Sequence, residues 1–343
     1  MSLKITGKLP SGKHLEKLKQ SPNYKKNAFR NLSDTPMKPG DISYWKMMRE
    51  FMNNNKNTVP PALLPSVKTD LHILNSSKPV IVWFGHSSYF IRIENTNFLI
   101  DPAFSGNASP FSFMIKAFPG SNIYKPEDMP AIDYLILTHD HYDHLDFKTV
   151  RKLRNKIDKI YCSLGIGSHL RYWGFDINKV TEMDWWESEQ LDKGISLTAA
   201  PARHFSGRGI KRGQTLWSSF ILKTKDHTLY LGGDSGYDSH FKEIGDKYGP
   251  FDVAILEAGQ YNAMWPLIHM MPEETVQAAV DLKAKALLPV HWGKFTLAMH
   301  AWNDPVKRVV EKAKELNIKV LTPKIGQPLI LDDSFEPESW WEM

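Results

Sequence analysis

The stretch THDHYDH, residues 138–144, places three histidines and two aspartates within six consecutive positions. It follows an apolar run, residues 134–137, which predicts a buried strand. It precedes Asp146, a predicted N-cap, and a helix that is expected to begin at Phe147. The cluster is therefore predicted to form a tight turn from a strand to a helix, at a sheet edge where ligands bind.

The spacing within this turn favours two metal ions. His139 and His141 are two residues apart, so both imidazoles point to the same side of an extended segment. Asp143 and His144 follow where the chain turns, and they can face a second point close by. One short loop can thus supply ligands to two ions about 3.5–4 Å apart, as in binuclear hydrolases. A lone histidine is more often structural, but HxHxDH at a strand end indicates a metal site.

Three further predicted strands end in a side chain that can bind a metal. If these strands lie side by side, the three side chains converge with the THDHYDH turn. They are His204 after strand 197–200, Asp234 at the tip of strand 228–231, and His291 after strand 286–290. The predicted ligand set is His139, His141 and His204 for one ion, Asp143, His144 and His291 for the other, and Asp234 as the bridge.

Length and composition describe an ordinary globular protein. The chain has 343 residues, of which 42% are hydrophobic and 24% are charged. Cys162 is the only cysteine, which excludes a disulfide within the chain and a thiolate metal site. Residues 1–21 lack the apolar core of a secretory signal, and no run approaches the ~20 apolar residues of a membrane span. We expect a cytoplasmic protein without a transmembrane segment.

The positive charge is concentrated at the start of the chain. Residues 1–30 contain eight Lys or Arg and one Glu, which gives +7, whereas the whole chain carries +5. This basic arm is either a solvated face or a surface attracted to anionic lipid headgroups, at ~1 kcal/mol per basic residue. A nucleic-acid partner is the least favoured interpretation, because few aromatic residues alternate with the lysines.

The predicted organisation has three parts. Residues 1–77 form an extended basic arm and an extension with a short helix at 43–52, residues 78–335 form the hydrolase domain, and residues 336–343 form a C-terminal tail. Within the domain, residues 105–130 are expected to form a long loop that is unusually rich in Phe. This loop is either a lid packed on its own core or an apolar wall for a greasy substrate. Oligomeric state is left open, and a homo-oligomer is compatible with the several tryptophans.

The motifs around the predicted ligands resemble the metallo-β-lactamase superfamily, and within it the branch of phospholipase D enzymes that hydrolyse N-acylphosphatidylethanolamine. The resemblance covers about residues 80–330. Besides THDHYDH, the motifs that carry it are WFGHS at 83–87, IDPAFS at 100–105, PARH at 201–204, TLW at 215–217, GGDSG at 232–236, HMMPEE at 269–274 and PVHWGKF at 289–295.

The resemblance implies an α/β (α+β) fold of the αββα type, with two mixed sheets face to face and helices outside. It implies two divalent ions, most simply Zn although Fe and Mn also accept such ligands, and a metal-bridging hydroxide that attacks phosphorus. Asp143 or Asp234 would orient that nucleophile, and His269 would contact the phosphate or protonate the leaving group. Residues expected to support ligands or touch substrate are His86, Glu257 and Trp217.

The predicted function is a metal-dependent phosphodiesterase of phospholipase D type, acting on N-acylphosphatidylethanolamine-like lipids and touching an anionic membrane peripherally. One alternative is a lactonase, or another ester hydrolase, that acts on a small phosphorylated sugar. The other is a metal-stabilised binding protein without turnover. A small polar pocket would favour the lactonase, and a steep salt dependence of nucleic-acid affinity would favour the binding protein.

Overall fold

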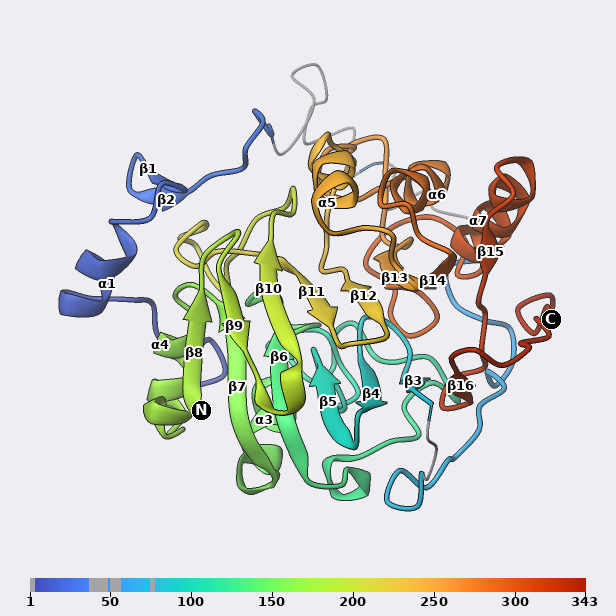
Figure 1. Ribbon diagram of the computed structural model, residues 1–343, viewed down its shortest axis with the longest axis horizontal. Helices are drawn as coiled ribbons and strands as arrows, with labels where there is room; N and C mark the ends of the chain where they lie inside the picture. Colours follow the sequence, from blue (N-terminus) through green and yellow to red (C-terminus); the bar gives the residue numbers. More distant parts are fainter. Residues whose placement is uncertain (1–3, 37–48, 50–56, 75–77) are drawn as a thin grey trace.

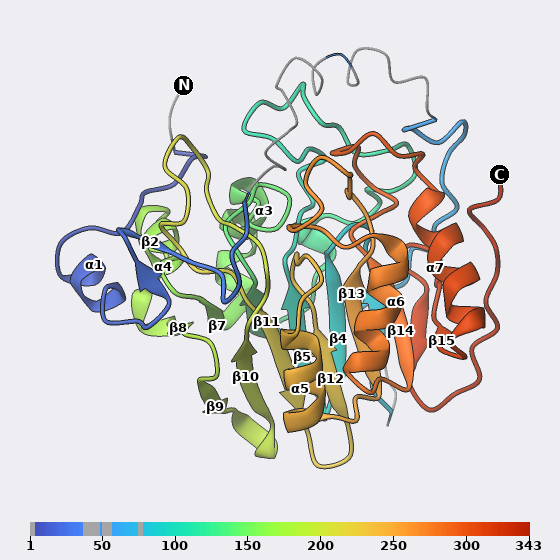
Figure 2. The ribbon, with the colours of Figure 1, turned by 90° about the horizontal axis from the view of Figure 1, so that it is seen from above.

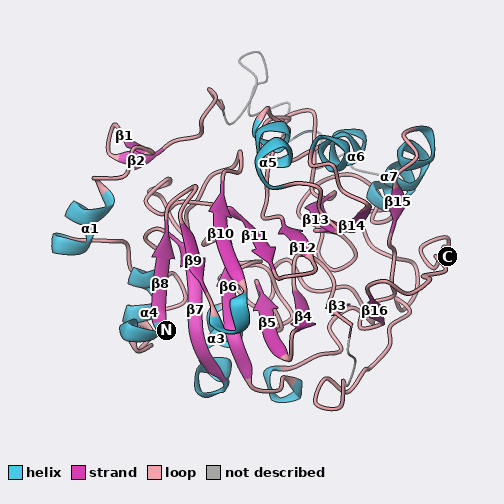
Figure 3. Cartoon of the chain, viewed as in Figure 1, coloured by secondary structure: helices cyan, strands magenta, loops and turns pink. Residues whose placement is uncertain are grey.

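The computed structural model describes residues 4–36, 49, 57–74 and 78–343. The helix expected at 43–52 lies outside the described residues except for Arg49. Within the described part of the chain, two seven-stranded sheets face each other and helices cover their outer faces (Figures 1 and 3). The αββα sandwich with two mixed sheets is thereby confirmed.

The first sheet combines an antiparallel half with a parallel half. Neighbours from β16 to β5 are antiparallel, and neighbours from β5 to β8 are parallel. Its spatial order is β16 (Pro328–Ile330), β3 (Val80–Trp83), β4 (Tyr89–Ile93), β5 (Thr96–Ile100), β6 (Ile132–Leu137), β7 (Ile157–Ser163) and β8 (Val180–Met183).

The second sheet repeats this arrangement. Neighbours from β9 to β12 are antiparallel, and those from β12 to β15 are parallel. Its order is β9 (Ser188–Gln190), β10 (Ser196–Ala200), β11 (Ser219–Lys223), β12 (Thr228–Leu231), β13 (Val253–Glu257), β14 (Ala286–Val290) and β15 (Lys319–Val320).

Strand β3 shows how the sequence builds the layers. All four of its residues are buried. Ile81 and Trp83 belong to the core between the two sheets, whereas Val80 and Val82 belong to the core on the outer face of the first sheet. Successive side chains of a strand point to opposite faces, so an uninterrupted apolar run is what a strand covered on both sides requires.

Helices close the two outer cores. On the first sheet these are α3 (Phe147–Leu153) and α4 (Gly167–Tyr172). On the second sheet they are α5 (His240–Tyr248), α6 (Pro272–Asp281) and α7 (Asp304–Glu315), which Figure 2 shows along that sheet. The side chain of Asp146 caps α3 by accepting a hydrogen bond from the Lys148 N–H, as the sequence predicts. In the described part of the chain, no helix combines the length and the apolar character that crossing a membrane requires.

The strand directions bring the functional loops to one edge. Strands β3, β5 and β6 run the same way in the first sheet, as do β10, β12, β13 and β14 in the second. Their carboxyl ends therefore meet at one edge of each sheet, where α/β proteins bind ligands. Residues 138–144, which follow β6, lie at this edge.

The N-terminal arm differs from the extended segment that its composition predicts. It contains α1 (Gly12–Leu18) and a small hairpin, β1 (Tyr24–Lys25) with β2 (Ala28–Phe29). Leu18 and Phe29 form a fourth core with residues that include Trp185 and Trp217. The arm packs beside α4 and β8 because it buries its few apolar side chains there (Figure 1).

The last residues of the chain are also packed. Trp340 and Trp341 are 7% and 3% exposed. The ring of Trp340 stacks on Trp292, with centroids 5.1 Å apart, and Trp292 lies against Trp83 of β3. These tryptophans therefore belong to the core between the sheets.

Candidate metal centre

Four side chains that the sequence predicts as ligands form a first cluster, consisting of His139, His141, His204 and Asp234, each with one ligand atom within 4.8 Å of the others. The Nδ1 of His141 lies 3.0 Å from the Nε2 of His139 and 3.2 Å from the Nε2 of His204. Nitrogens bound tetrahedrally to one zinc ion at ~2.0–2.1 Å would lie about 3.3 Å apart. The spacing therefore fits a single shared ion.

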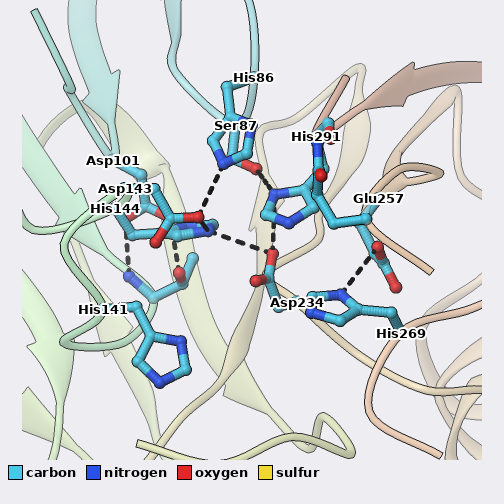
Figure 4. A network of polar contacts seen from close by, with 12 residues as sticks. His86, Ser87, Asp101, His141, Asp143, His144, Asp234, Glu257, His269 and His291 are labelled. Carbon is cyan, nitrogen blue, oxygen red and sulfur yellow. Dashed lines mark hydrogen bonds and ion pairs between the residues drawn. The ribbon is translucent and has the colours of Figure 1, made fainter. Parts of the chain in front are cut away.

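A second cluster contains His86, Asp143, His144 and His291, again with ligand atoms within 4.8 Å of one another. The Nε2 of His144 lies 3.6 Å from the nearer oxygen of Asp143. His86 was expected to support a ligand, and its Nε2 lies 2.8 Å from the Oδ2 of Asp143 (Figure 4). The side chain of Asp143 is thus held between two imidazoles.

Asp234 lies between the two clusters, and each of its oxygens faces one of them. Its Oδ2 is 3.7 Å from the Nε2 of His139 and 3.7 Å from that of His204. Its Oδ1 is 3.2 Å from the Nε2 of His144 and 3.1 Å from the Nδ1 of His291. A carboxylate in this position can bind two ions at once, as the sequence predicts for Asp234.

The polar atoms between the clusters support this interpretation. The Oδ1 of Asp234 and the Nε2 of His144 are buried 3.2 Å apart, but neither makes a hydrogen bond of normal geometry with a described residue. An unpaired buried polar atom costs about 1–3 kcal/mol, so two of them aimed at one point require an explanation. A divalent cation bound to both would remove the cost, and His and Asp are ligands that Zn²⁺ accepts. The residues present therefore fit a two-metal site.

The electrostatics of the site also suit cations. Burial keeps the pKa values of His139, His204 and His291 well below the usual histidine value, so these imidazoles are neutral, as metal ligands must be. Burial alone would raise the pKa of Asp234, but His144 and the other imidazoles outweigh it and hold that pKa well below the usual range. Asp234 is therefore ionised.

His144 departs from the other imidazoles. Burial would lower its pKa, but the carboxylates of Asp234 and Asp143 raise it well above the usual value. Asp101, which the ligand prediction omitted, adds to this field through its Oδ2, 2.8 Å from the Nδ1 of His144. The same negative field that favours a proton on His144 favours a metal cation at that point.

Asp101 orients His144 from behind. It stands at the end of β5 with φ +41°, and it accepts hydrogen bonds from both the N–H and the hydroxyl of Thr138. A carboxylate that fixes the second ring nitrogen of a ligand histidine sets the tautomer and the direction of the ring. Asp101 directly follows a strand, as the predicted ligands follow theirs, and this position was the sequence signal that could have identified it.

Two other predicted ligands contact groups that leave no sequence signal. The Nδ1 of His204 lies 2.8 Å from the carbonyl oxygen of Ile268, and the Nδ1 of His291 lies 2.8 Å from the hydroxyl of Ser87. His86 and His291 both have positive φ, +55° and +68°, which is uncommon for residues other than glycine. The turns that follow β3 and β14 are bent in this way where they present their histidines to the cluster.

Glu257 and His269 form a pair beside the metal cluster. The Nδ1 of His269 lies 3.2 Å from one oxygen of Glu257, and the backbone N–H of Met270 donates to the other. Burial raises the pKa of Glu257 to about 7, and the pKa of His269 is also raised, because Glu257 outweighs burial there. One ring nitrogen of His269 lies within 4.8 Å of ligand atoms of Asp234 and His291, so His269 faces the centre from the side of the second sheet (Figure 4).

Trp217 lies further from the centre than the other predicted site residues. Its indole N–H donates to the carbonyl of Ala202 and to the side-chain oxygen of Asn31, at 3.0 and 2.9 Å. Asn31 in turn accepts from the N–H of His204 at 3.0 Å and donates to its carbonyl at 2.8 Å. Trp217 therefore reaches the predicted ligand His204 through Asn31, a residue of the N-terminal arm that the sequence did not single out.

Comparison with known proteins agrees with this geometry. Residues 96–292 match the beta-lactamase superfamily domain. A solved structure of a metallo hydrolase from Ignicoccus hospitalis is similar at a TM-score of 0.57 and 20% identity, and the similarity covers 75% of this chain and 100% of that one. The chain belongs to the metallo-β-lactamase superfamily, and it is a metal-dependent hydrolase of that superfamily.

Two curated relatives place the chain within the superfamily. An uncharacterised protein of Mycobacterium tuberculosis is 36% identical over 329 residues, which cover 94% of this chain and 88% of the relative. The N-acyl-phosphatidylethanolamine-hydrolyzing phospholipase D 1 of Caenorhabditis elegans is 29% identical over 316 residues, which cover 81% and 84%. The chain stands near this phospholipase D branch.

Proposed function

We propose that the protein is a phosphodiesterase of phospholipase D type that acts on N-acylphosphatidylethanolamine-like lipids. The observation that carries the proposal is Asp234, whose two oxygens each face one cluster of metal-competent side chains. The similarity to the Caenorhabditis elegans enzyme supports the lipid substrate.

The proposed metal ligands are those that the sequence predicts, namely His139, His141, His204, Asp143, His144, His291 and Asp234. We propose zinc, because neutral imidazoles and carboxylates are among its preferred ligands. When bound, two such cations would make hydroxide available at neutral pH and would neutralise charge on the phosphoryl oxygens.

The remaining steps fall to the side chains of the chain itself. Asp143 and Asp234 are ionised, so each can accept a hydrogen bond from the attacking water and orient it toward phosphorus. The new bond joins the water oxygen to phosphorus, and the bond from phosphorus to the headgroup oxygen breaks. The leaving oxygen needs a proton, which His269 can donate because Glu257 favours its protonated form.

We further propose that the loop between β5 and β6 contacts lipid. Phe111 and Phe113 are 58% and 73% exposed, and their rings lie 5.9 Å apart. Phe104 and Phe118 of the same loop are buried and anchor it to the domain. Exposed aromatic side chains on an anchored loop can enter a membrane surface, which the basic arm would attract when the lipids are anionic. A cytoplasmic location at the membrane surface stays a prediction.

The test is mass spectrometry of the products after metal-loaded protein meets vesicles that contain N-acylphosphatidylethanolamine. The expected products are N-acylethanolamine and phosphatidic acid, and Asp234→Asn is expected to lose them while keeping its fold by circular dichroism. Full activity in that variant would contradict the role of Asp234. If protein that carries two metals gave no product, the lipid substrate would be refuted, and sugar-phosphate lactones would be the next substrates to assay.

A further inference from the structure

A pocket of about 540 Å³ opens beside the ligand His204. One wall is the N-terminal arm, residues 25–35, and the other is formed by Phe205 and residues of the loop that follows it. His204 is one of the lining residues, so the pocket adjoins the first cluster. Neither the ligand set nor the proposed mechanism uses it.

The pocket is lined by more positive than negative groups, and its basic side chains are Lys25, Lys26, Arg30 and Arg212. All four are exposed, and none forms an ion pair with another described residue. Asp34 is the one acidic residue among the described residues of the lining. The guanidinium of Arg212 lies over the ring of Phe205 at 4.9 Å, which holds this charge next to the ligand His204. Unpaired cations held around a concave surface raise the local concentration of anions.

The loop between β5 and β6, with its exposed Phe111 and Phe113, lies near the second cluster. The loop that exposes Phe111 and Phe113 is tied to Lys294, whose backbone carbonyl accepts from the N–H of Phe118. The ammonium of Lys294 donates to the carbonyl of Phe84, two residues before His86. The apolar loop therefore adjoins the second cluster, whereas the basic pocket adjoins the first. A phosphodiester centred on Asp234 would direct its two substituents into surroundings of different chemistry.

We propose that the basic pocket binds a carboxylate or phosphate group carried by the substrate headgroup, apart from the phosphodiester that is hydrolysed. The inference rests on the proposed phosphodiesterase function and specifies the headgroup. Leu32 also lines the pocket and is 57% exposed, so it would contact the acyl chain of an N-acylated headgroup. The preferred substrate is then a phospholipid whose N-acylated headgroup bears an additional negative charge.

The experiment compares two lipids that differ by one carboxylate. N-acylphosphatidylethanolamine and N-acylphosphatidylserine with the same acyl chains are presented to the metal-loaded protein in neutral vesicles. We expect kcat/KM to be about tenfold higher for the serine lipid, as a few partly exposed ion contacts would give. This preference is expected to shrink as salt is added, because exposed charges are screened.

A variant with neutralised pocket charges then tests whether the pocket is responsible. The pocket variant carries Lys25→Gln, Arg30→Gln and Arg212→Gln. The control carries Lys13→Gln, Lys17→Gln and Lys211→Gln, which lie on the same arm and loop, are exposed, and do not line the pocket. Both lose three charges, so general attraction to the vesicle changes equally. The pocket variant is expected to lose the preference, and the control is expected to keep it.

A binding measurement tests whether the pocket binds the headgroup anion, and it does not require turnover. Isothermal titration of the metal-loaded protein with N-acylserine and with N-acylethanolamine is expected to show tighter binding of N-acylserine in the control and not in the pocket variant. Equal behaviour of the two variants would overturn the inference. Binding of inorganic phosphate at the pocket, with no difference between the two amides, would overturn it too, because the site would then hold a separate anion. Absence of turnover of both lipids would refute the proposed function, and the titration would still show whether the pocket binds the carboxylate.

Discussion

The contact between Asn31 and His204 gives the sharpest test of whether the N-terminal arm stabilises the candidate metal centre. The carboxamide of Asn31 accepts from the backbone N–H of His204 and donates to its carbonyl, at 3.0 and 2.8 Å. It therefore pairs with the backbone of a ligand as a neighbouring strand would. Replacing Asn31 with Ala removes both contacts and leaves the imidazole of His204 untouched.

The magnitude follows from what each partner loses. The indole of Trp217 keeps the carbonyl of Ala202 at 3.0 Å, so it remains satisfied. The N–H and the carbonyl of His204 lose their partner, which costs about 1–3 kcal/mol for each group that stays buried. Asn31 is only partly buried, and water can replace it in part, so we expect about 1–2 kcal/mol in total. If the whole cost destabilises the conformation of His204 that binds metal, metal affinity drops about tenfold. This is the low end of the roughly 10–100-fold loss that is typical when a residue supporting a metal ligand is replaced.

The assay is competition with a chelator for zinc, together with the visible spectrum of the cobalt-substituted protein, which reports ligand geometry. Asn23→Ala is the matched control, because Asn23 also anchors the arm, through Asp184 at 2.8 Å, but its hydrogen bonds within the described part of the chain do not reach a predicted ligand. We expect Asn31→Ala to weaken metal binding and change the spectrum clearly more than Asn23→Ala does, because Asn23 can act only through docking of the arm. Equal metal affinity and identical spectra in the two variants would refute the reasoning.

Three further variants test other parts of the site. Burial lowers the pKa of Lys294 from 10.5 to about 7, so the folded protein gains stability as the pH rises from 7 to 10.5 and loses it as the pH falls again. The free energy of unfolding of the wild type, measured by denaturant titration, should therefore rise by about 1.4 kcal/mol per pH unit between pH 7.5 and 9.5. Lys294→Met should remove this rise. Asp101→Asn should lower zinc affinity about 10–100-fold and reduce bound zinc below two per chain by elemental analysis, because His144 loses its orienting carboxylate; unchanged stoichiometry and affinity would contradict this. Phe111→Ser with Phe113→Ser should weaken vesicle binding about tenfold in a sedimentation assay and leave hydrolysis of a soluble diester unchanged; equal sedimentation would exclude the loop from the membrane contact.

The sandwich was predicted from the resemblance of the motifs, and its inner strands were predicted because they are buried on both faces. Such strands appear as uninterrupted apolar runs, and the run at residues 134–137 lies within β6. The strand β9 left no such signal, since its residues Ser188–Gln190 are all exposed and its place depends on pairing with β10. The packed arm was missed for a similar reason. Its folding depends on contacts with distant residues such as Trp217, and short helices have little stability of their own.

The convergence of metal-competent side chains was predictable because strands that run the same way bring their ends together, so such a residue at each end is a pattern in the sequence itself. The supporting residues were not predictable in the same way. Ser87 and Asn31 are ordinary polar residues in loops, and only the fold brings them against His291 and His204. The pairing of Glu257 with His269 likewise depends on a loop that returns beside β13.

Asp140 shows that the arm and the metal loop are physically connected. It belongs to THDHYDH, but its side chain pairs with His169 at 3.2 Å and accepts from the N–H of Gly207 at 2.7 Å. Burial opposes its ionisation, yet the hydrogen bond with His169 and the charge of the nearby Arg208 hold the pKa of Asp140 at about 2. One of those neighbours, Arg208, donates to the carbonyl of Asp140 and also to that of Ile5 in the arm, both at 2.7 Å.

The arm therefore holds both sides of the first cluster. Ile5 reaches the loop of His139 and His141 through Arg208, and Asn31 reaches His204 directly. Metal binding requires these loops to hold one arrangement, and the docked arm stabilises that arrangement. Because linkage is reciprocal, bound metal must stabilise the docked arm by the same free energy that the arm contributes to metal affinity. A wall of the basic pocket belongs to the same arm, so substrate specificity and metal affinity would depend on one segment. Comparing the metal affinity of Asn31→Ala with that of Asn23→Ala measures how much of this affinity comes from the contact with His204.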